Sequence, residues 1–219
     1  MATYAEFGTL NSGEGVLTFN ANTWLYEMSY SEEIKVSTPD ISISDNDKVP
    51  EKLKFELFNY YSLDTKEYYW EMNAATENVV IKDSLQQIDW KIFNDSTKTI
   101  GGFQCTKAEG KLGGWDVEAW FSVDVPVPCG PWRFWGLPGL IVNASSKDGD
   151  IDIQMTSLKQ TEQSPVLPDI HDKKIIKKNE FMPLLKSNAQ KLARVMSNMQ
   201  DRDGVMSVNV KVDQRDKCF

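Results

Sequence analysis

The chain has 219 residues, of which 41% are hydrophobic and 26% charged, a composition typical of a folded domain rather than of a disordered chain. The formal net charge is −8, and an excess of acidic residues argues against binding to nucleic acid or to an anionic membrane surface. No apolar run approaches the roughly 18 residues that a membrane-spanning helix needs. We therefore expect one domain over residues 1–219, without a transmembrane segment.

Apolar and polar residues alternate with a period of two in several segments, which is the pattern of half-buried β-strands. In chain order these segments are residues 24–30, 53–57, 88–92, 117–125, 151–155 and 206–212. Polar or glycine-containing turn signals stand at 45–47, 101–102, 113–114 and 148–149, the last of which is typical of a tight hairpin. The spacing predicts consecutive antiparallel strands rather than strands that alternate with helices.

One segment, from about residue 179 to 201, has the period of an amphipathic helix. We expect Asn179 to cap this helix and Gly204 to follow its end. Its apolar stripe consists of Phe181, Leu185, Leu192, Met196 and Met199. We expect this stripe to pack on the sheet, and binding of a partner by its methionines is the alternative. The sequence thus predicts a mainly β (α+β) fold with one C-terminal helix.

A connector with Pro165 and Pro168 leads to this helix, and the richest basic cluster of the chain lies at its end. The cluster consists of Lys173, Lys174, Lys177 and Lys178. We interpret it as a solvated approach to the helix, and a phosphate-binding patch is the alternative interpretation.

Residues 125–142 read VPVPCGPWRFWGLPGLIV and depart from the strand pattern. Proline cannot donate to a β-ladder, so a regular central strand is excluded until after Pro138. Two interpretations are open: a packed loop that closes one end of the sheet, and a binding rim anchored by tryptophan and arginine. The candidate residues for binding a ligand or partner are Trp132, Arg133, Phe134, Trp135, Leu137 and Pro138.

Residues 136–141 of this segment spell GLPGLI, and further short elements precede them in a fixed order. These are WK at 90–91, GFQCTKA at 102–108, AWF at 119–121 and GPW at 130–132. From about residue 90 to 142 the chain resembles the GLPGLI family. It departs from the family's pattern at Gly113-Gly114, where members often carry Gly-Arg, and at Cys129.

The resemblance implies an exported protein of an uncharacterised bacterial family, with no activity that can be carried over. It implies a location in the periplasm, at the outer membrane or outside the cell, with a signal peptide removed ahead of Met1. Some members are encoded near outer-membrane transporter genes. Because the periplasm is oxidising, export also permits a disulfide between Cys105 and Cys129, with three free thiols as the alternative.

The sequence contains no recognisable catalytic machinery. His171 is the only histidine, and a Cys129–His171 pair is a conceivable nucleophile and base, but we interpret His171 as an ordinary surface residue. A zinc site would need carboxylates to complete its ligands. We therefore assign no catalytic residue, no metal and no cofactor.

We instead expect a non-enzymatic binding or accessory protein of the cell envelope. Adjacent aromatic residues, such as Tyr60-Tyr61 and the run at 68–70, point to opposite faces of a strand, so both faces must be covered or used. By analogy with carrier proteins of this compartment, we expect a large curved antiparallel sheet or half-open barrel. Its aromatic-rich surface would hold an apolar ligand, a peptide or an envelope protein. The alternatives are an accessory subunit of an outer-membrane transport complex, and a hydrolase that uses carboxylates or a cysteine.

Overall fold

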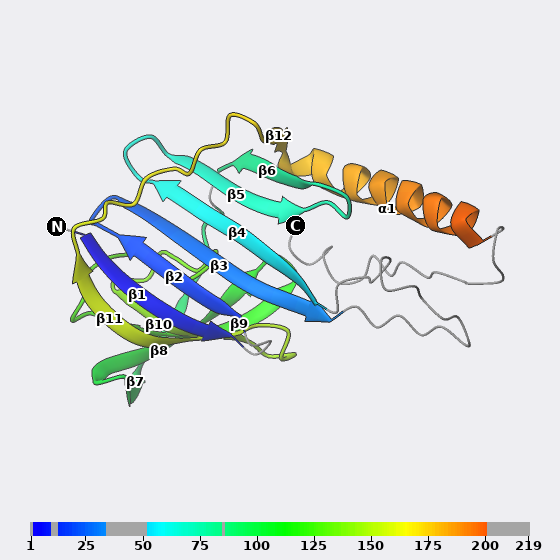
Figure 1. Cartoon of the computed structure of the whole chain (residues 1–219). Helices are drawn as coiled ribbons and strands as arrows, with labels where there is room; N and C mark the ends of the chain where they lie inside the picture. Colours follow the sequence, from blue (N-terminus) through cyan, green and yellow to red (C-terminus); the bar gives the residue numbers. More distant parts are fainter. Residues whose placement is uncertain (1, 10–12, 34–51, 85, 201–219) are drawn as a thin grey trace.

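The computed structural model describes residues 2–9, 13–33, 52–84 and 86–200. These residues form one twelve-stranded sheet in the order β12-β6-β5-β4-β3-β2-β1-β11-β10-β9-β8-β7. The strands are β1 (Ala2–Thr9), β2 (Glu14–Phe19), β3 (Thr23–Glu33), β4 (Lys52–Ser62), β5 (Glu67–Asn73), β6 (Asn78–Asp83), β7 (Lys91–Ile100), β8 (Phe103–Leu112), β9 (Trp115–Ser122), β10 (Leu140–Ser146), β11 (Asp152–Thr161) and β12 (Lys174–Lys177). A single helix, α1 (Lys178–Gln200), follows β12 within the described residues. The expected mainly β fold with one C-terminal helix is therefore confirmed (Figure 1).

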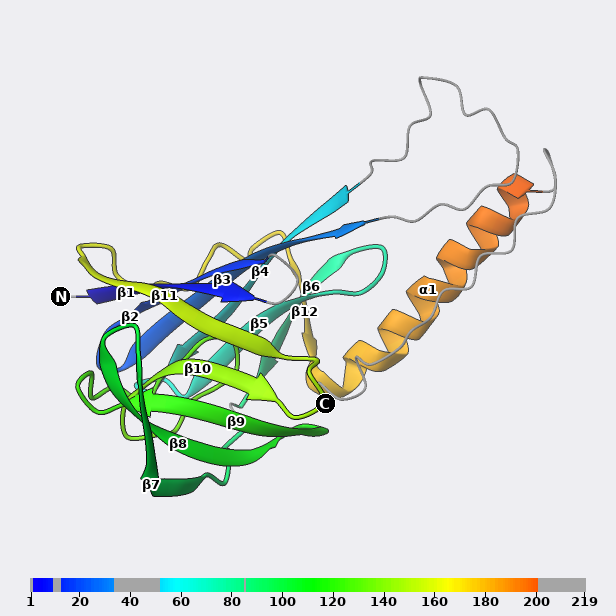
Figure 2. The ribbon, with the colours of Figure 1, turned by 90° about the horizontal axis from the view of Figure 1, so that it is seen from below.

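The sheet curls so strongly that its two halves face each other (Figure 2). β1 lies between β2 and β11, so it joins the half made of β2–β6 to the half made of β7–β11. All neighbours are antiparallel except β12, which pairs with β6 in parallel. Consecutive antiparallel strands were expected, but the β1–β11 and β6–β12 pairs join segments far apart in the chain.

The glycine turns form where the sequence places them. Gly101 and Gly102 have φ angles of 57° and 88° in the turn between β7 and β8. These left-handed values suit glycine because it has no Cβ. Gly149, with a φ of 82°, turns the chain between β10 and β11 as the Asp148-Gly149 signal predicts.

Two predicted strands have different bounds in the structure. β7 begins at Lys91, so Ile88 and Trp90 precede the strand and pack into the interior instead. β9 ends at Ser122, before the last two apolar residues of the predicted strand at 117–125. The turn at 45–47 and the strand at 206–212 lie outside the described residues.

The helix packs against β6 and β12 through its first turns. Phe181 and Leu185 are buried in the main core, and the Asn188 side chain donates a 3.0 Å hydrogen bond to the carbonyl of Ala74. The expected cap at Asn179 is wrong: the carboxylate of Glu180 accepts a 2.8 Å hydrogen bond from the backbone N–H of Lys177. Such a bond, from the third helical residue back to the residue before the helix, is half of a capping box.

The curvature gives the sheet an inner and an outer face, each with its own apolar cluster. The inner face carries Trp24, Tyr26 and Trp70, which belong to a core shared with residues of β8–β11. A smaller cluster on the outer face consists of Leu25, Phe58, Tyr69 and Val80, and Leu167 and Ile170 of the connector at 162–173 pack against it. Across the described ranges, no helix combines the length and apolar character needed to cross a bilayer.

Candidate functional site

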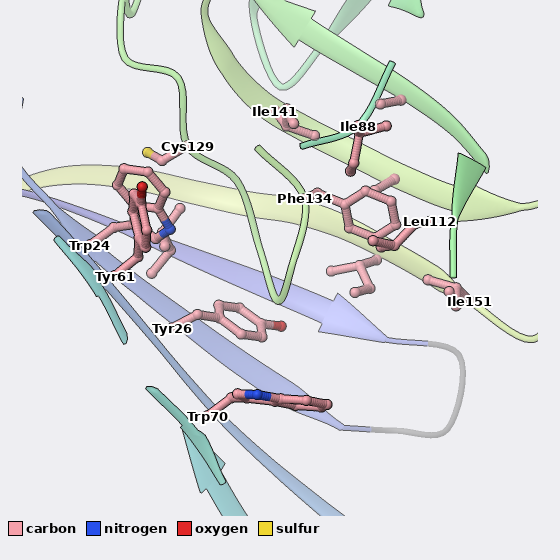
Figure 3. Close-up of a cluster of buried hydrophobic side chains, with 14 of the residues drawn as sticks. Trp24, Tyr26, Tyr61, Trp70, Ile88, Leu112, Cys129, Phe134, Ile141 and Ile151 are labelled. Carbon is pink, nitrogen blue, oxygen red and sulfur yellow. The ribbon is translucent and has the colours of Figure 1, made fainter. Parts of the chain in front are cut away.

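The proline-rich segment between β9 and β10, residues 123–139, lies against the inner face, and we call it the plug. Phe134 is completely buried, and Leu137 and Cys129 are buried beside it. Figure 3 shows Phe134 among side chains from both halves of the sheet, with Leu112 next to it and Tyr26 and Trp70 opposite. The plug therefore fills the space that a curved sheet would otherwise leave open.

Backbone hydrogen bonds fix the plug to the strand that follows it. The N–H of Leu140 donates to the carbonyl of Val125 at 2.9 Å, and the N–H of Ile141 donates to the carbonyl of Cys129 at 3.0 Å. An isolated bridge pairs Cys129 with Trp135, which folds the plug back on itself. These bonds satisfy buried polar groups that proline-interrupted backbone cannot place in a regular ladder.

The two glycines of the GLPGLI stretch are required for different physical reasons. Gly136 has a φ of 92°, a conformation that residues with a Cβ rarely adopt. Gly139 approaches the backbone of Ser122 so closely that a Cβ would overlap its carbonyl group. Both glycines therefore allow the plug to turn tightly and to enter β10.

Arg133 places a guanidinium group in the interior. The residue is only 4% exposed, and its guanidinium carbon lies 4.7 Å from the ring centre of Trp70 and 5.7 Å from that of Trp132. Cation–π attraction to two rings offsets part of the cost of removing the charge from water. Trp132 itself adopts a left-handed φ of 53°, and the ring of Trp115, 5.8 Å away, packs against it.

Trp135 connects the plug to the chain segment before β7. Its indole Nε1 donates to the carbonyl of Gln86 at 2.8 Å, and its own carbonyl accepts from Nε1 of Trp90 at 2.8 Å. Its ring lies 5.6 Å from that of Tyr61 and 6.3 Å from that of Trp24. These contacts explain why Trp90 lies outside β7, although the sequence pattern places it in a strand at 88–92.

The structure thus divides the six candidate binding residues. Arg133, Phe134 and Leu137 are buried, whereas Trp132 and Trp135 are half-buried and Pro138 is exposed. The buried side chains cannot touch a partner in this conformation and contribute packing. The expected concave apolar surface is occupied by the chain's own plug.

Cys105 and Cys129 are both buried free thiols, and the structure contains no disulfide between them. Burial raises the pKa of the Cys129 thiol far above its usual range and also raises the pKa of Cys105. A thiol held in its neutral form is a poor nucleophile. His171 is exposed on the connector, whereas Cys129 lies in the inner core, so the two do not form a catalytic pair.

Carboxylates on the outer face of β8 and β9 form an ion-pair network. The ammonium group of Lys107 lies 3.0 Å from Glu109 and 2.8 Å from Glu118. The hydrogen bond from Lys107 lowers the pKa of Glu109, which is opposite to the raised pKa that a general acid needs. Within the described part of the chain, no group of three or more His, Cys, Asp or Glu side chains is arranged to hold a metal ion.

The outer face carries a hollow of about 810 Å³ that the sequence did not reveal, and we call it the outer groove. The register of three adjacent strands brings Val16, Glu27 and Phe58 side by side on its surface. Pro168 and Lys173 of the connector form one wall. A sequence pattern reports which residues share a strand face, but not which residues of neighbouring strands become partners.

The outer groove has a mixed polar and apolar lining in which carboxylates predominate among the charged groups. Glu14, Glu27 and Glu56 are exposed, and Glu27 lies between Val16 and Phe58 on the groove surface. Glu71 is only 5% exposed, and Lys173 from the connector reaches it with an Nζ–carboxylate distance of 2.7 Å. The connector is thereby tied to β5 by a partly buried ion pair, which holds the groove wall in place.

Comparison with known proteins identifies a short family match and a shared fold. A family model described as "Protein of unknown function (Porph_ging)" matches residues 113–143, which include the plug. The structure of PNGF-II in the C2 space group has a TM-score of 0.57 and 17% identity, and covers 86% of this chain and 33% of its own. The P21 form gives 0.55 and 17%, with coverage of 86% and 34%.

At this identity the likeness to PNGF-II concerns the fold alone, and the chain spans about a third of the length of PNGF-II. No curated protein matches the chain in sequence. The family match overlaps the stretch that resembles GLPGLI, and its description names no activity. The resemblance to GLPGLI proteins stays a prediction.

Proposed function

We propose that this chain is an exported, non-enzymatic binding protein of the bacterial cell envelope that holds a peptide or protein partner in its outer groove. The observation that carries the proposal is the groove itself. Its volume of about 810 Å³ lies within the range of roughly 300–1,000 Å³ that ligand sites typically have. Its walls come from β2–β6 and the connector, so hydrogen-bonded strands hold most of its surface rigid.

The chemistry of the groove favours a particular kind of partner. Val16 is half-buried and Phe58 is buried in the floor of the groove, and three exposed glutamates lie beside them. These carboxylates would attract basic side chains, and Lys173 shows that an ammonium group fits beside Glu71 and over the ring of Phe58, 5.5 Å from its centre.

Part of the plug remains available as an additional contact. Trp132 and Trp135 retain some exposed surface and Pro138 is exposed, so only these three of the sequence-derived candidates can meet a partner. Location in the cell envelope is supported by the resemblance in residues 90–142.

The proposal is tested by capture of partners from envelope fractions of the native host, followed by mass spectrometry. The wild-type chain is compared with a double variant, Glu27→Lys and Glu56→Lys. Both glutamates line the groove and are exposed, so the variant reverses two charges there without loss of core packing. The control is Asp152→Lys with Glu162→Lys, which changes the net charge equally at exposed positions outside the groove.

We expect the wild type and the control to retain the same partner and the groove variant to lose it. Equal retention by all three would show that the groove is not the binding site. Trp132→Ala and Trp135→Ala are then examined separately. Weaker capture by a folded variant would show that this tryptophan contacts the partner, whereas unfolding of the variant would show that the tryptophan serves only in packing. Recovery of an outer-membrane transport complex would identify the chain as an accessory subunit.

A further inference from the structure

One edge of the sheet is formed by a short strand in which two isoleucines stand between two lysines. β12, with the sequence KIIK, is the last strand in the sheet order and pairs with β6 on one side (Figure 1). No other strand of the described residues pairs with its outer side. An edge strand presents unpaired N–H and C=O groups and can accept a further strand. In β12 the N–H of Lys177 is already bonded to Glu180, so a further strand would pair with the residues before it.

A hollow of about 890 Å³ lies beside this edge, and we call it the edge hollow. The end of β6, β12 and the first turn of α1 line it. Ile175 is 49% exposed at this place, although isoleucine is mostly buried in proteins, and Met182 is half-buried next to it. The edge hollow therefore offers apolar surface next to an open strand edge.

The basic cluster found in the sequence divides into two pairs. Lys173 and Lys174 form ion pairs with Glu71 at 2.7 Å and Glu77 at 3.4 Å. Lys177 and Lys178 line the edge hollow, and no carboxylate of the described chain lies within 4.0 Å of their ammonium groups.

Three further charged groups line the edge hollow, and the hydrogen bonds that Asp83 and Glu180 accept from backbone N–H groups leave both carboxylates charged. Lys82 pairs with Glu67 at 2.7 Å, and Glu180 accepts the capping hydrogen bond at the start of α1. Asp83 accepts a 2.8 Å hydrogen bond from the N–H of Ser84. Two ammonium groups are thus available beside the open edge of a chain whose net charge is −8.

From this arrangement we infer that β12 and the edge hollow form a second docking surface, which accepts an extended acidic polypeptide segment as an additional strand. The backbone of the segment pairs with the outer side of β12, an apolar side chain covers Ile175, and acidic side chains meet Lys177 and Lys178. The lysines also disfavour a second copy of this chain, because two β12 edges would bring like charges together. The surface is distinct from the outer groove and does not depend on its role.

The test uses fluorescence anisotropy with three labelled six-residue peptides. The first has valines and glutamates two residues apart, so that both types fall on the strand face shared by Ile175 and Lys177. The second has lysines in place of the glutamates, and the third has the charge of the first but prolines in place of the valines. Proline removes backbone donors, so the third peptide separates strand pairing from simple charge attraction. The expected order is clear binding of the first peptide and at least tenfold weaker binding of the other two.

Two matched variants locate the site. Lys177→Glu with Lys178→Glu should weaken binding of the acidic peptide by about tenfold or more, because two attractive pairs become repulsive. The control, Lys159→Glu with Lys186→Glu, changes the net charge by the same amount at exposed positions elsewhere and should leave peptide binding unchanged. The outer-groove variant Glu27→Lys with Glu56→Lys should also bind the peptide normally.

The inference is overturned if the control weakens binding as much as the edge variant, or if the proline peptide binds as well as the valine peptide. It is also overturned if sedimentation shows a dimer that the acidic peptide does not dissociate, because a second copy would then occupy the edge. If the peptide tests contradict the edge inference but the outer groove still captures its partner, the proposed function is retained.

Discussion

Replacement of Phe134 with alanine tests whether the plug is part of the core. The side chain is completely buried between the two halves of the sheet. A buried aromatic ring removes roughly 150 Å² or more of apolar surface from water, which at about 25 cal/mol per Å² corresponds to about 4 kcal/mol. This value agrees with the range of about 3–5 kcal/mol for Phe→Ala changes in protein cores.

The loss is a large part of the free energy of unfolding of a typical domain, about 5–15 kcal/mol. Urea unfolding followed by tryptophan fluorescence measures it, with Val123→Ala as the control in the same segment. Val123 is 60% exposed, so its truncation should change the free energy of unfolding by no more than about 0.5 kcal/mol. A loss below about 1 kcal/mol for Phe134→Ala would refute the packing role of the plug.

Three further predictions concern the plug and the ion pairs. Gly139→Ala should destabilise the protein by about 3 kcal/mol or more in urea unfolding, because the added Cβ overlaps backbone that cannot move aside. Gly136→Ala should cost only about 1–2 kcal/mol, from its positive φ; equal losses would contradict the distinction. Thiol labelling with mass spectrometry should leave Cys129 unmodified in the native protein and modify it in denaturant, since burial keeps the thiol neutral; rapid native labelling would contradict this. Finally, Lys107 lowers the pKa of Glu109, so their interaction stabilises the fold above the unfolded glutamate pKa of about 4.3 and is lost as the pH falls through the lowered folded value. Lys107→Met should therefore reduce the loss of stability between about pH 5 and pH 2, and an unchanged pH dependence would count against it.

Local sequence was sufficient to predict those elements whose signal lies within one strand, one helix or one turn. Alternation of apolar and polar residues placed β3, β4 and β11, and the helical period placed α1. β10 begins at Leu140, after the last proline of the segment, as expected because proline has no N–H group for a β-ladder. Such signals are local because side-chain period and backbone restrictions depend on neighbouring residues.

The irregular segment before β10 was found from sequence, but its environment was not. Tryptophan, arginine and glycine at 130–139 indicate a special backbone, and the same residue types are typical of buried packing and of binding hot spots. Only the structure shows that Phe134 and Leu137 are enclosed while Pro138 is exposed. The outer groove gave no sequence signal, because its surface joins Val16, Glu27 and Phe58 from three strands.

The β-strand pattern, the glycine hairpins, the helix and the irregular stretch before β10 follow from the order of the residues alone. Only the assembled fold shows that β1 pairs with β11, that β12 forms one edge of the sheet, and that the plug fills the curved sheet. The physical reason is that alternation identifies an apolar face without identifying its cover. Which segment covers it depends on contacts between residues far apart in the chain, and these exist only in the assembled fold.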